Sequence, residues 1–213
     1  RCEKDKRSYI GLFRPTSDYI TGMAKLRALT MAKRVAAVDF EATHLSGSVL
    51  VEVNGKLSFE GLHEHRDFIR AKLLDMTCEK HLKYQKLLPP RYIAVHVRLG
   101  DFRQVTSGNA GQTSTRTPLS WFSKQIEKVA AQLTIPVLVF SDGSASELAP
   151  LLQMPAVSLA PDGSSIAHLF ALANAEVLIG SNSSFSYWGA FLGRGLTVFP
   201  VSDVDWGYKG HTA

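Results

Sequence analysis

Short apolar runs alternate with segments of helical spacing along the second half of the chain. The runs are rich in Val, Ile, Leu and Phe and are bounded by Pro, Gly or polar residues, as buried strands are. Strands that alternate with helices of this length predict an α/β fold, with a parallel sheet and helices on both of its faces. The predicted strands are residues 92–98, 136–140, 156–159, 177–180 and 196–199, and the predicted helices are residues 118–133, 144–153, 164–174 and 185–192.

The first half of the chain is less regular. Apolar residues between Asp18 and Ala37 have mixed spacing, and we expect a helix there. Residues 49–53 predict a strand that leads into Asn54-Gly55, a pair typical of tight turns. Apolar residues from Glu60 to about Leu88 predict an amphipathic helix, which Pro89-Pro90 ends.

Composition places the chain among ordinary soluble globular proteins, with 45% hydrophobic and 20% charged residues. Its 213 residues suit one α/β domain with an appendage, or one domain and part of another. Because the chain begins with Arg1 rather than Met, we expect it to be part of a longer protein. Two cysteines, Cys2 and Cys78, without a visible leader or a membrane-spanning stretch, indicate a reducing compartment. We therefore expect a cytoplasmic location.

The net charge of +5 is concentrated at the amino end. Residues 1–34 carry nine Lys or Arg against three Asp or Glu, a net of +6, and the remainder carries 15 against 16, a net of −1. Such an arm binds nucleic acid or an anionic membrane surface, or it is a solvated helical face. Aromatic residues do not interleave with it in a nucleic-acid-binding pattern. We expect no nucleic-acid partner, and a peripheral contact with the inner face of a membrane stays open.

The first of two polar clusters closes the predicted strand at residues 92–98. Arg98 stands two positions before Gly100, and its planar guanidinium suits two phosphate oxygens, although a structural ion pair with Asp101 is the alternative. His96 points to the same side of the strand as Arg98, and we expect it to orient its neighbours, with a role as catalytic base as the alternative. Asp101 is a candidate to orient Arg98, hold a sugar hydroxyl or accept a proton, or it is a turn aspartate bonded to its own backbone.

The second cluster, Ser181-Asn-Ser-Ser-Phe-Ser186, follows the predicted strand at residues 177–180 and begins a predicted helix. The first amides of a helix lack intrahelical partners and attract anions, so they suit a diphosphate. Ser141-Asp142 occupies the same position after the predicted strand at residues 136–140. Because ligands bind beyond the carboxyl ends of the strands in open α/β sheets, these three strand ends predict a phosphate site for a nucleotide-linked substrate.

Other motifs contribute little to this picture. His63-Glu-His65 is a weak metal candidate, because two histidines at i and i+2 have no third ligand nearby, and we expect both at the surface. Neither a Walker loop nor a Gly-x-Gly-x-x-Gly fingerprint is present, so phosphate recognition would be of another type.

The clusters resemble, in order and spacing, the motifs of glycosyltransferase family 11, the α-1,2-fucosyltransferases. Residues 96–102, His-Val-Arg-Leu-Gly-Asp-Phe, resemble its His-x-Arg-x-Gly-Asp-aromatic signature, and residues 140–142 resemble its Phe-Ser-Asp stretch. Residues 181–190 are similar to its carboxyl-terminal Asn-Ser-Ser/Thr-Phe-Ser-Trp-Trp block. Related motifs occur in α-1,6- and protein O-fucosyltransferases. The resemblance covers roughly residues 57–200.

The resemblance implies the carboxyl-terminal, donor-binding half of a GT-B glycosyltransferase. Residues 89–213 would then form a Rossmann-like doubly wound parallel sheet, and residues 1–88 a partial acceptor-side region with the basic arm. The implied reaction is inverting α-1,2-fucosyl transfer from GDP-fucose to a glycan hydroxyl, without a metal ion or another cofactor. The candidate catalytic residues are Arg98, Asp101 and His96, and the candidate donor-binding residues are Arg98, Ser141, Asp142, Asn182, Ser183, Ser184 and Phe185.

Two departures from the family pattern bear on these expectations. The amino-terminal Gly-Asn-Gln motif is absent, which fits a chain that begins late. Leu99 stands where many relatives carry a second arginine, which bears on the affinity for the donor or on its identity. The alternatives are a transferase for another nucleotide sugar, a non-catalytic nucleotide- or glycan-binding module of the same fold, and an anion- or partner-binding domain that uses the basic arm.

Overall fold

The computed structural model describes residues 11–15, 20, 22–36, 49–52, 59–104, 115–202 and 207–208. The chain divides into two compact units, one of residues 14–57 and the other of residues 1–13 and 58–213. Cys2, part of the predicted basic arm and the turn at Asn54-Gly55 lie outside the described residues. The assignment of residues 1–88 to the acceptor side and of residues 89–213 to the donor side stays a prediction.

A parallel sheet forms the centre of the larger unit. In the described part of the chain it has five strands in the order β5-β4-β3-β6-β7, and every neighbouring pair is parallel. The chain runs outward from β3 to β5 and then returns to the other side of β3, which is the Rossmann-like order with its reversal between β3 and β6. All five predicted strands are confirmed, as β3 (Ile93–Val97), β4 (Val137–Ser141), β5 (Val157–Leu159), β6 (Val177–Gly180) and β7 (Leu196–Val198).

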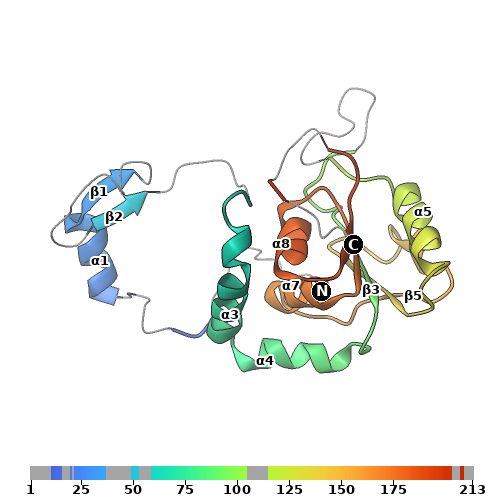
Figure 1. Cartoon of the computed structure of the whole chain (residues 1–213), viewed down its shortest axis with the longest axis horizontal. Helices are drawn as coiled ribbons and strands as arrows, with labels where there is room; N and C mark the ends of the chain where they lie inside the picture. Colours follow the sequence, from blue (N-terminus) through green and yellow to red (C-terminus); the bar gives the residue numbers. More distant parts are fainter. Residues whose placement is uncertain are drawn as a thin grey trace. The chain divides into compact units, whose positions relative to one another are not determined.

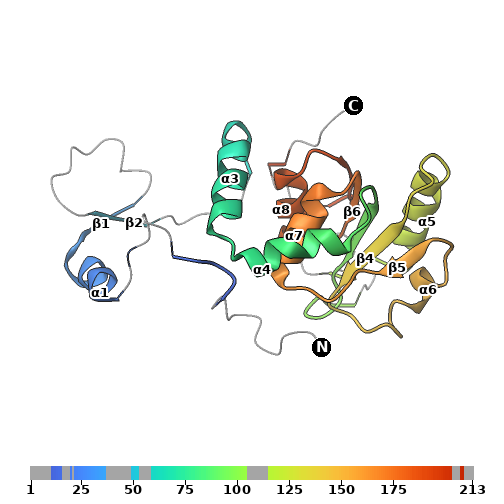
Figure 2. The ribbon, with the colours of Figure 1, turned by 90° about the horizontal axis from the view of Figure 1, so that it is seen from below.

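Helices cover both faces of this sheet, as the sequence predicts. α5 (Leu119–Ala130) and α6 (Ala149–Leu152) lie on one face, and α7 (Ser165–Asn174) and α8 (Ser184–Leu192) lie on the other (Figures 1 and 2). The pleat of β3 sends Val95 into the core that α5 closes and Ala94 into the core that α7 closes. All five residues of β3 are buried, which explains the nearly continuous apolar sequence of this central strand.

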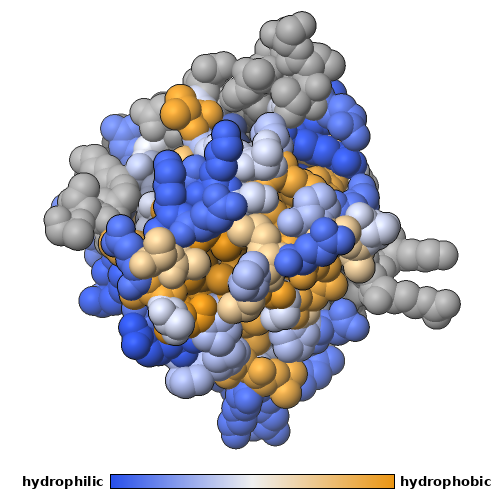
Figure 3. All heavy atoms as spheres, turned by 90° about the vertical axis from the view of Figure 1, so that its right-hand side faces the viewer, coloured by the Kyte–Doolittle hydropathy of each residue, from blue (hydrophilic) through white to orange (hydrophobic). Residues whose placement is uncertain are grey.

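The face that carries α5 is shown in Figure 3, where apolar side chains gather between hydrophilic ones. Trp121, Val129, Leu133 and Ile135 pack against the core from this side and remain partly buried. Single apolar residues of this kind are ordinary on the outer layer of a core.

One predicted helix is divided in the structure. The chain does not form a single helix from Glu60 to Leu88, because the backbone is extended at Thr77 and Cys78. Cys78 N donates to Leu12 O at 2.9 Å, and Thr77 forms an antiparallel bridge with Phe13. Apolar spacing cannot reveal this break, since its cause is a contact with a distant segment. The elements are η1 (His63–His65), α3 (Arg66–Met76), α4 (Glu79–Leu82) and η2 (Lys83–Leu87).

Another predicted helix, at residues 144–153, is shorter in the structure, where only α6 (Ala149–Leu152) forms. Glu147 accepts hydrogen bonds from the backbone N–H and the hydroxyl of Ser144, both at 2.9 Å, and this turn precedes the helix.

In its described part, the unit of residues 14–57 holds α1 (Gly22–Met31), β1 (Lys33–Ala36) and β2 (Val49–Glu52). The predicted strand at residues 49–53 is confirmed as β2, and it pairs in parallel with β1. The helix predicted between Asp18 and Ala37 is shorter than expected because residues 33–36 enter this pairing. Across both units, the described residues include no helix of the length and apolar character that a bilayer span requires.

Arg70 links α3 to the carboxyl ends of α7 and α8 by hydrogen bonds. Its Nη1 donates to the carbonyl of Leu192 at 2.7 Å, and its Nη2 donates to Oδ1 of Asn174 at 2.6 Å. Leu192 and Asn174 are the last residues of α8 and α7. The cation therefore binds a carbonyl that has no intrahelical donor and lies at the favourable end of the helix dipole.

Replacing Arg70 with alanine is expected to lower the free energy of unfolding by about 1.5–3 kcal/mol, the range for hydrogen bonds to charged groups. The matched control is Lys83→Ala, which removes an exposed 3.1 Å ion pair with Glu79 and should cost less than about 0.5 kcal/mol. Urea unfolding followed by circular dichroism measures both variants. Equal losses would contradict the fastening role of Arg70.

Candidate functional site

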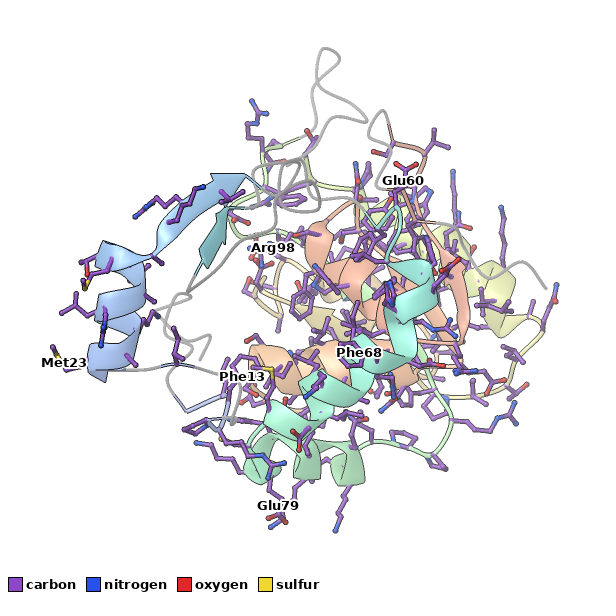
Figure 4. All side chains as sticks on the ribbon, turned by 60° about the vertical axis from the view of Figure 1, so that its left-hand side comes forward. Phe13, Met23, Glu60, Phe68, Glu79 and Arg98 are labelled. Atoms are coloured by element: carbon purple, nitrogen blue, oxygen red, sulfur yellow. The ribbon has the colours of Figure 1, made fainter. Side chains whose placement is uncertain are left out.

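The carboxyl ends of β3 and β6 meet at the reversal of the sheet. His96 on β3 stands opposite Gly180 on β6 in the strand register. One residue further on, the hydroxyl of Ser181 accepts from Arg98 N at 2.9 Å and donates to His96 O at 2.7 Å. Figure 4 shows Arg98 well separated from Glu79, the first residue of α4. The structure therefore brings the arginine and the serine-rich segment to one edge, as the sequence predicts.

The guanidinium of Arg98 lies between two carboxylates. Its Nε and Nη2 are each 2.9 Å from Oδ1 of Asp101, and its Nη1 is 2.9 Å from Oδ2 of Asp142. The side chain is 25% exposed, and its carbon Cζ lies 5.9 Å from the centre of the Phe102 ring. The ion pair with Asp101, considered as an alternative to phosphate binding, is thus present in the structure.

Asp142 holds the backbone that carries Arg98. Its Oδ1 accepts from Leu99 N at 2.8 Å and from Gly100 N at 3.1 Å, and its side chain is 8% exposed. Ser141 does similar work, since its hydroxyl donates to Val97 O at 2.7 Å and accepts from Gly143 N at 3.0 Å. Both side chains bond to the main chain at the strand ends, which favours a positioning role over direct donor contact.

Leu99 turns away from Arg98 into the core on the α5 side, where it is buried. A Cβ atom at Gly143 would lie 2.5 Å from Leu99 Cδ1, so the glycine makes room for this leucine. Leu99 also lines a cavity of about 390 Å³ together with Arg116, Pro118 and Glu147. The side chain at position 99 can therefore influence Arg98 through packing, since it does not point toward the guanidinium.

The amino end of α8 has the form of an anion site. Ser183 caps the helix by accepting from Ser186 N at 3.3 Å, while Ser184 in the first turn is exposed. Amides in this first turn have no intrahelical acceptor, and the helix dipole adds partial positive charge. Asn182 is buried and donates through Nδ2 to Ser202 Oγ at 2.7 Å. The backbone amides around Ser184 and Phe185 are therefore better placed for an anion than the amide side chain of Asn182.

His96 ties β3 to α8 from inside the protein. Its Nδ1 shares a 2.6 Å hydrogen bond with Ser186 Oγ, and its ring lies 5.1 Å from that of Phe185. The side chain is 5% exposed, and burial, with a smaller effect of the Arg98 charge, lowers the pKa of His96 to about 3. A buried neutral imidazole that orients the first turn of α8 fits the expected positioning role better than that of catalytic base.

Two serines of the predicted polar cluster were not among its candidate donor-binding residues. Ser181 joins the strand ends, and Ser186 receives His96. Strand parity of His96 gives its side of the sheet, but which serine it meets depends on the turn between β6 and α8.

Of the histidines at residues 63 and 65, which were both expected at the surface, His65 is exposed and His63 is partly buried. Nε2 of His63 lies 3.0 Å from Gly207 O, and the ranges that the structure describes contain no group of three His, Cys, Asp or Glu suited to a metal ion.

A family model described as Glycosyl transferase family 11 matches residues 58–205, more than half of the chain. Among solved structures, POFUT1 in complex with GDP is 14% identical with a TM-score of 0.43, over 58% of this chain and 46% of that chain. NodZ alpha-1,6-fucosyltransferase co-crystallized with GDP is 19% identical with a TM-score of 0.44, over 72% of this chain and 55% of that chain. The chain thus spans about half the length of these proteins. No curated protein matches it.

The depressed pKa of His96 makes stability depend on pH. An unfolded histidine binds a proton below about pH 6.5, whereas folded His96 stays neutral down to about pH 3. The contribution of neutral His96 to the free energy of unfolding is therefore complete above pH 6.5. It is lost as the pH falls toward 3, by at most about 1.4 kcal/mol per pH unit. His96→Asn should flatten the dependence of unfolding free energy on pH between 4 and 6, as urea titrations at several pH values measure. His168, whose pKa is also lowered, remains in both proteins, and an unchanged slope would contradict the assignment.

Proposed function

The chain belongs to glycosyl transferase family 11, and from this we propose that it carries the donor half of a GT-B enzyme that transfers fucose from GDP-fucose to a glycan hydroxyl. The finer assignment, an inverting α-1,2 transfer, rests on the motif of residues 96–102 and on the serine block of residues 181–190. One observation carries the proposal. The 2.9 Å bond from Arg98 N to Ser181 Oγ joins the arginine to the segment that begins α8.

The chemistry of sugar transfer calls for this arrangement. As the bond between the sugar and the diphosphate breaks, negative charge develops on the leaving GDP. A guanidinium and the free amides of a helix terminus, fixed before the reaction, stabilise that charge without reorganisation. In our proposal Arg98 and the amides near Ser183, Ser184 and Phe185 bind the diphosphate, while Ser141 and Asp142 hold the loop that presents Arg98.

Inverting transfer needs a base on the acceptor side of the sugar. Of the two candidates, His96 is buried and neutral, and its Nδ1 is bonded to Ser186. Asp101 is 64% exposed at the loop entrance. We therefore propose Asp101 rather than His96 as the group that accepts the proton of the acceptor hydroxyl.

The partners in this proposal are a nucleotide-sugar donor and a glycan acceptor, with no nucleic acid. A cytoplasmic location and a peripheral contact of the basic arm with a membrane stay proposals.

Arg98→Ala in the full-length protein is expected to weaken GDP binding tenfold or more and to abolish fucosyl transfer, because a charge-assisted contact with the diphosphate is lost. Arg98→Lys should retain part of the binding, since lysine offers a point charge without the planar donor pair. The matched control is Arg91→Ala. The guanidinium of Arg91 binds Glu176 at 2.7 Å just before β3 begins, so it lies at the amino ends of the strands, away from Arg98. Calorimetric titration with GDP and UDP, beside a transfer assay, measures these effects. Full activity of Arg98→Ala would refute the role, and a preference for UDP would favour another donor.

Treatment with EDTA is expected to leave turnover unchanged, because in our proposal Arg98 and the helix amides provide the positive charge that faces the diphosphate. Turnover before and after chelation, and after addition of Mn²⁺ or Mg²⁺, tests this expectation. A strict requirement for Mn²⁺ would contradict it.

A further inference from the structure

We propose that the two carboxylates on Arg98 have opposite roles toward the donor. Asp142 fixes the orientation of the guanidinium, whereas Asp101 occupies the place of a phosphate oxygen and is displaced when the diphosphate binds. This inference rests on the proposed function, since it concerns the same diphosphate site.

The position of Asp101 on the guanidinium is that of a competing anion. A single oxygen, Oδ1, lies 2.9 Å from Nε and 2.9 Å from Nη2. The Nε–Nη2 edge presents two parallel N–H donors, and carboxylates and phosphates bind this edge in the same way. Two anions cannot occupy it together, so a phosphate that takes this edge must displace Asp101.

Asp142 has the opposite character. Its Oδ2 meets Nη1 at the other end of the guanidinium, at 2.9 Å, and its Oδ1 accepts from the amides of Leu99 and Gly100. The side chain is 8% exposed against 64% for Asp101. Releasing Asp142 would leave a buried charge and two backbone donors without acceptors, which is costly. Releasing Asp101 returns an exposed carboxylate to water, which costs little.

The exchange requires little movement of the chain. The backbone amides of Leu99 and Gly100 stay bonded to Asp142 while the side chain of Asp101 rotates away. Nη1 stays paired with Asp142, so the guanidinium keeps its direction and only its anion changes. Once displaced, Asp101 is available to the acceptor hydroxyl, and donor binding thereby prepares the proposed base.

The test is calorimetric titration of the full-length protein with GDP and GMP, in low salt and in 0.5 M salt. Asp101→Asn removes the competing charge and is expected to bind GDP about two- to fivefold more tightly in low salt, the worth of an exposed ion pair. The gain should shrink in 0.5 M salt and should be smaller for GMP, which has one phosphate fewer. Asp142→Asn should bind GDP at least tenfold more weakly and lose much of the preference for GDP over GMP.

The matched control is Glu127→Gln, which removes one negative charge from the exposed surface of α5 and should leave GDP affinity unchanged. Circular dichroism shows whether each variant is folded. If Asp142→Asn is not folded, the inference is tested by the GDP affinity of Asp101→Asn alone, because the exposed Asp101 can be replaced without unfolding the protein.

Equal or weaker GDP binding by Asp101→Asn would overturn the inference, because Asp101 would then support the arginine rather than compete for it. If the unaltered protein binds GDP, the proposed function survives that result. Absence of GDP binding to the unaltered protein would instead refute the proposed function, and this inference with it.

Discussion

The hydroxyl of Ser181 extends the pairing between β3 and β6, the two strands on which the site depends. It accepts from the amide of Arg98 and donates to the carbonyl of His96, so it continues the pairing of β3 and β6 beyond the end of the ladder. The strands diverge after this point, one toward the arginine loop and the other toward α8. Together with the bond between His96 and Ser186, this bridge holds the segment that carries Arg98 beside the first turn of α8.

The polar groups behind the site are bonded to other groups of the protein, either main chain or side chain, rather than aimed at solvent. Asp142 and Ser141 hold the end of β3 and the loop after it, and His96 with Ser186 holds the first turn of α8. Preorganisation of this kind is what electrostatic catalysis requires, since donors that are already oriented need not reorient as charge develops. The inner polar residues therefore form a scaffold that supports the partly exposed Arg98 and the exposed Asp101 and Ser184.

Local pattern was sufficient for the sheet but not for the contacts within the site. The apolar runs of β3 and β6 predict buried parallel strands. The carboxyl ends of parallel strands lie at the same side of a sheet, so the polar residues that follow each run are predicted to lie together. The break of the helix at Thr77 comes from pairing with Phe13, which no local pattern contains. In the same way, Asp142 was expected beside the donor, but its two bonds to Leu99 and Gly100 depend on how β4 lies against β3.

The segment after the arginine is closed at its base by the bridge between Arg103 and Thr115, where Arg116 N donates to Arg103 O at 2.9 Å. Asp142 binds the backbone of Leu99 and Gly100, which come before this bridge in the chain. We therefore expect a change in the number of residues between Arg103 and Thr115 to leave the position of the Arg98 guanidinium unchanged. In general, doubling the number of residues between two paired positions costs only about 0.6 kcal/mol in closure entropy. A change in the number of residues between Arg103 and Thr115 can therefore alter the surface beside this strand end while Asp142 keeps the backbone of Leu99 and Gly100 in place.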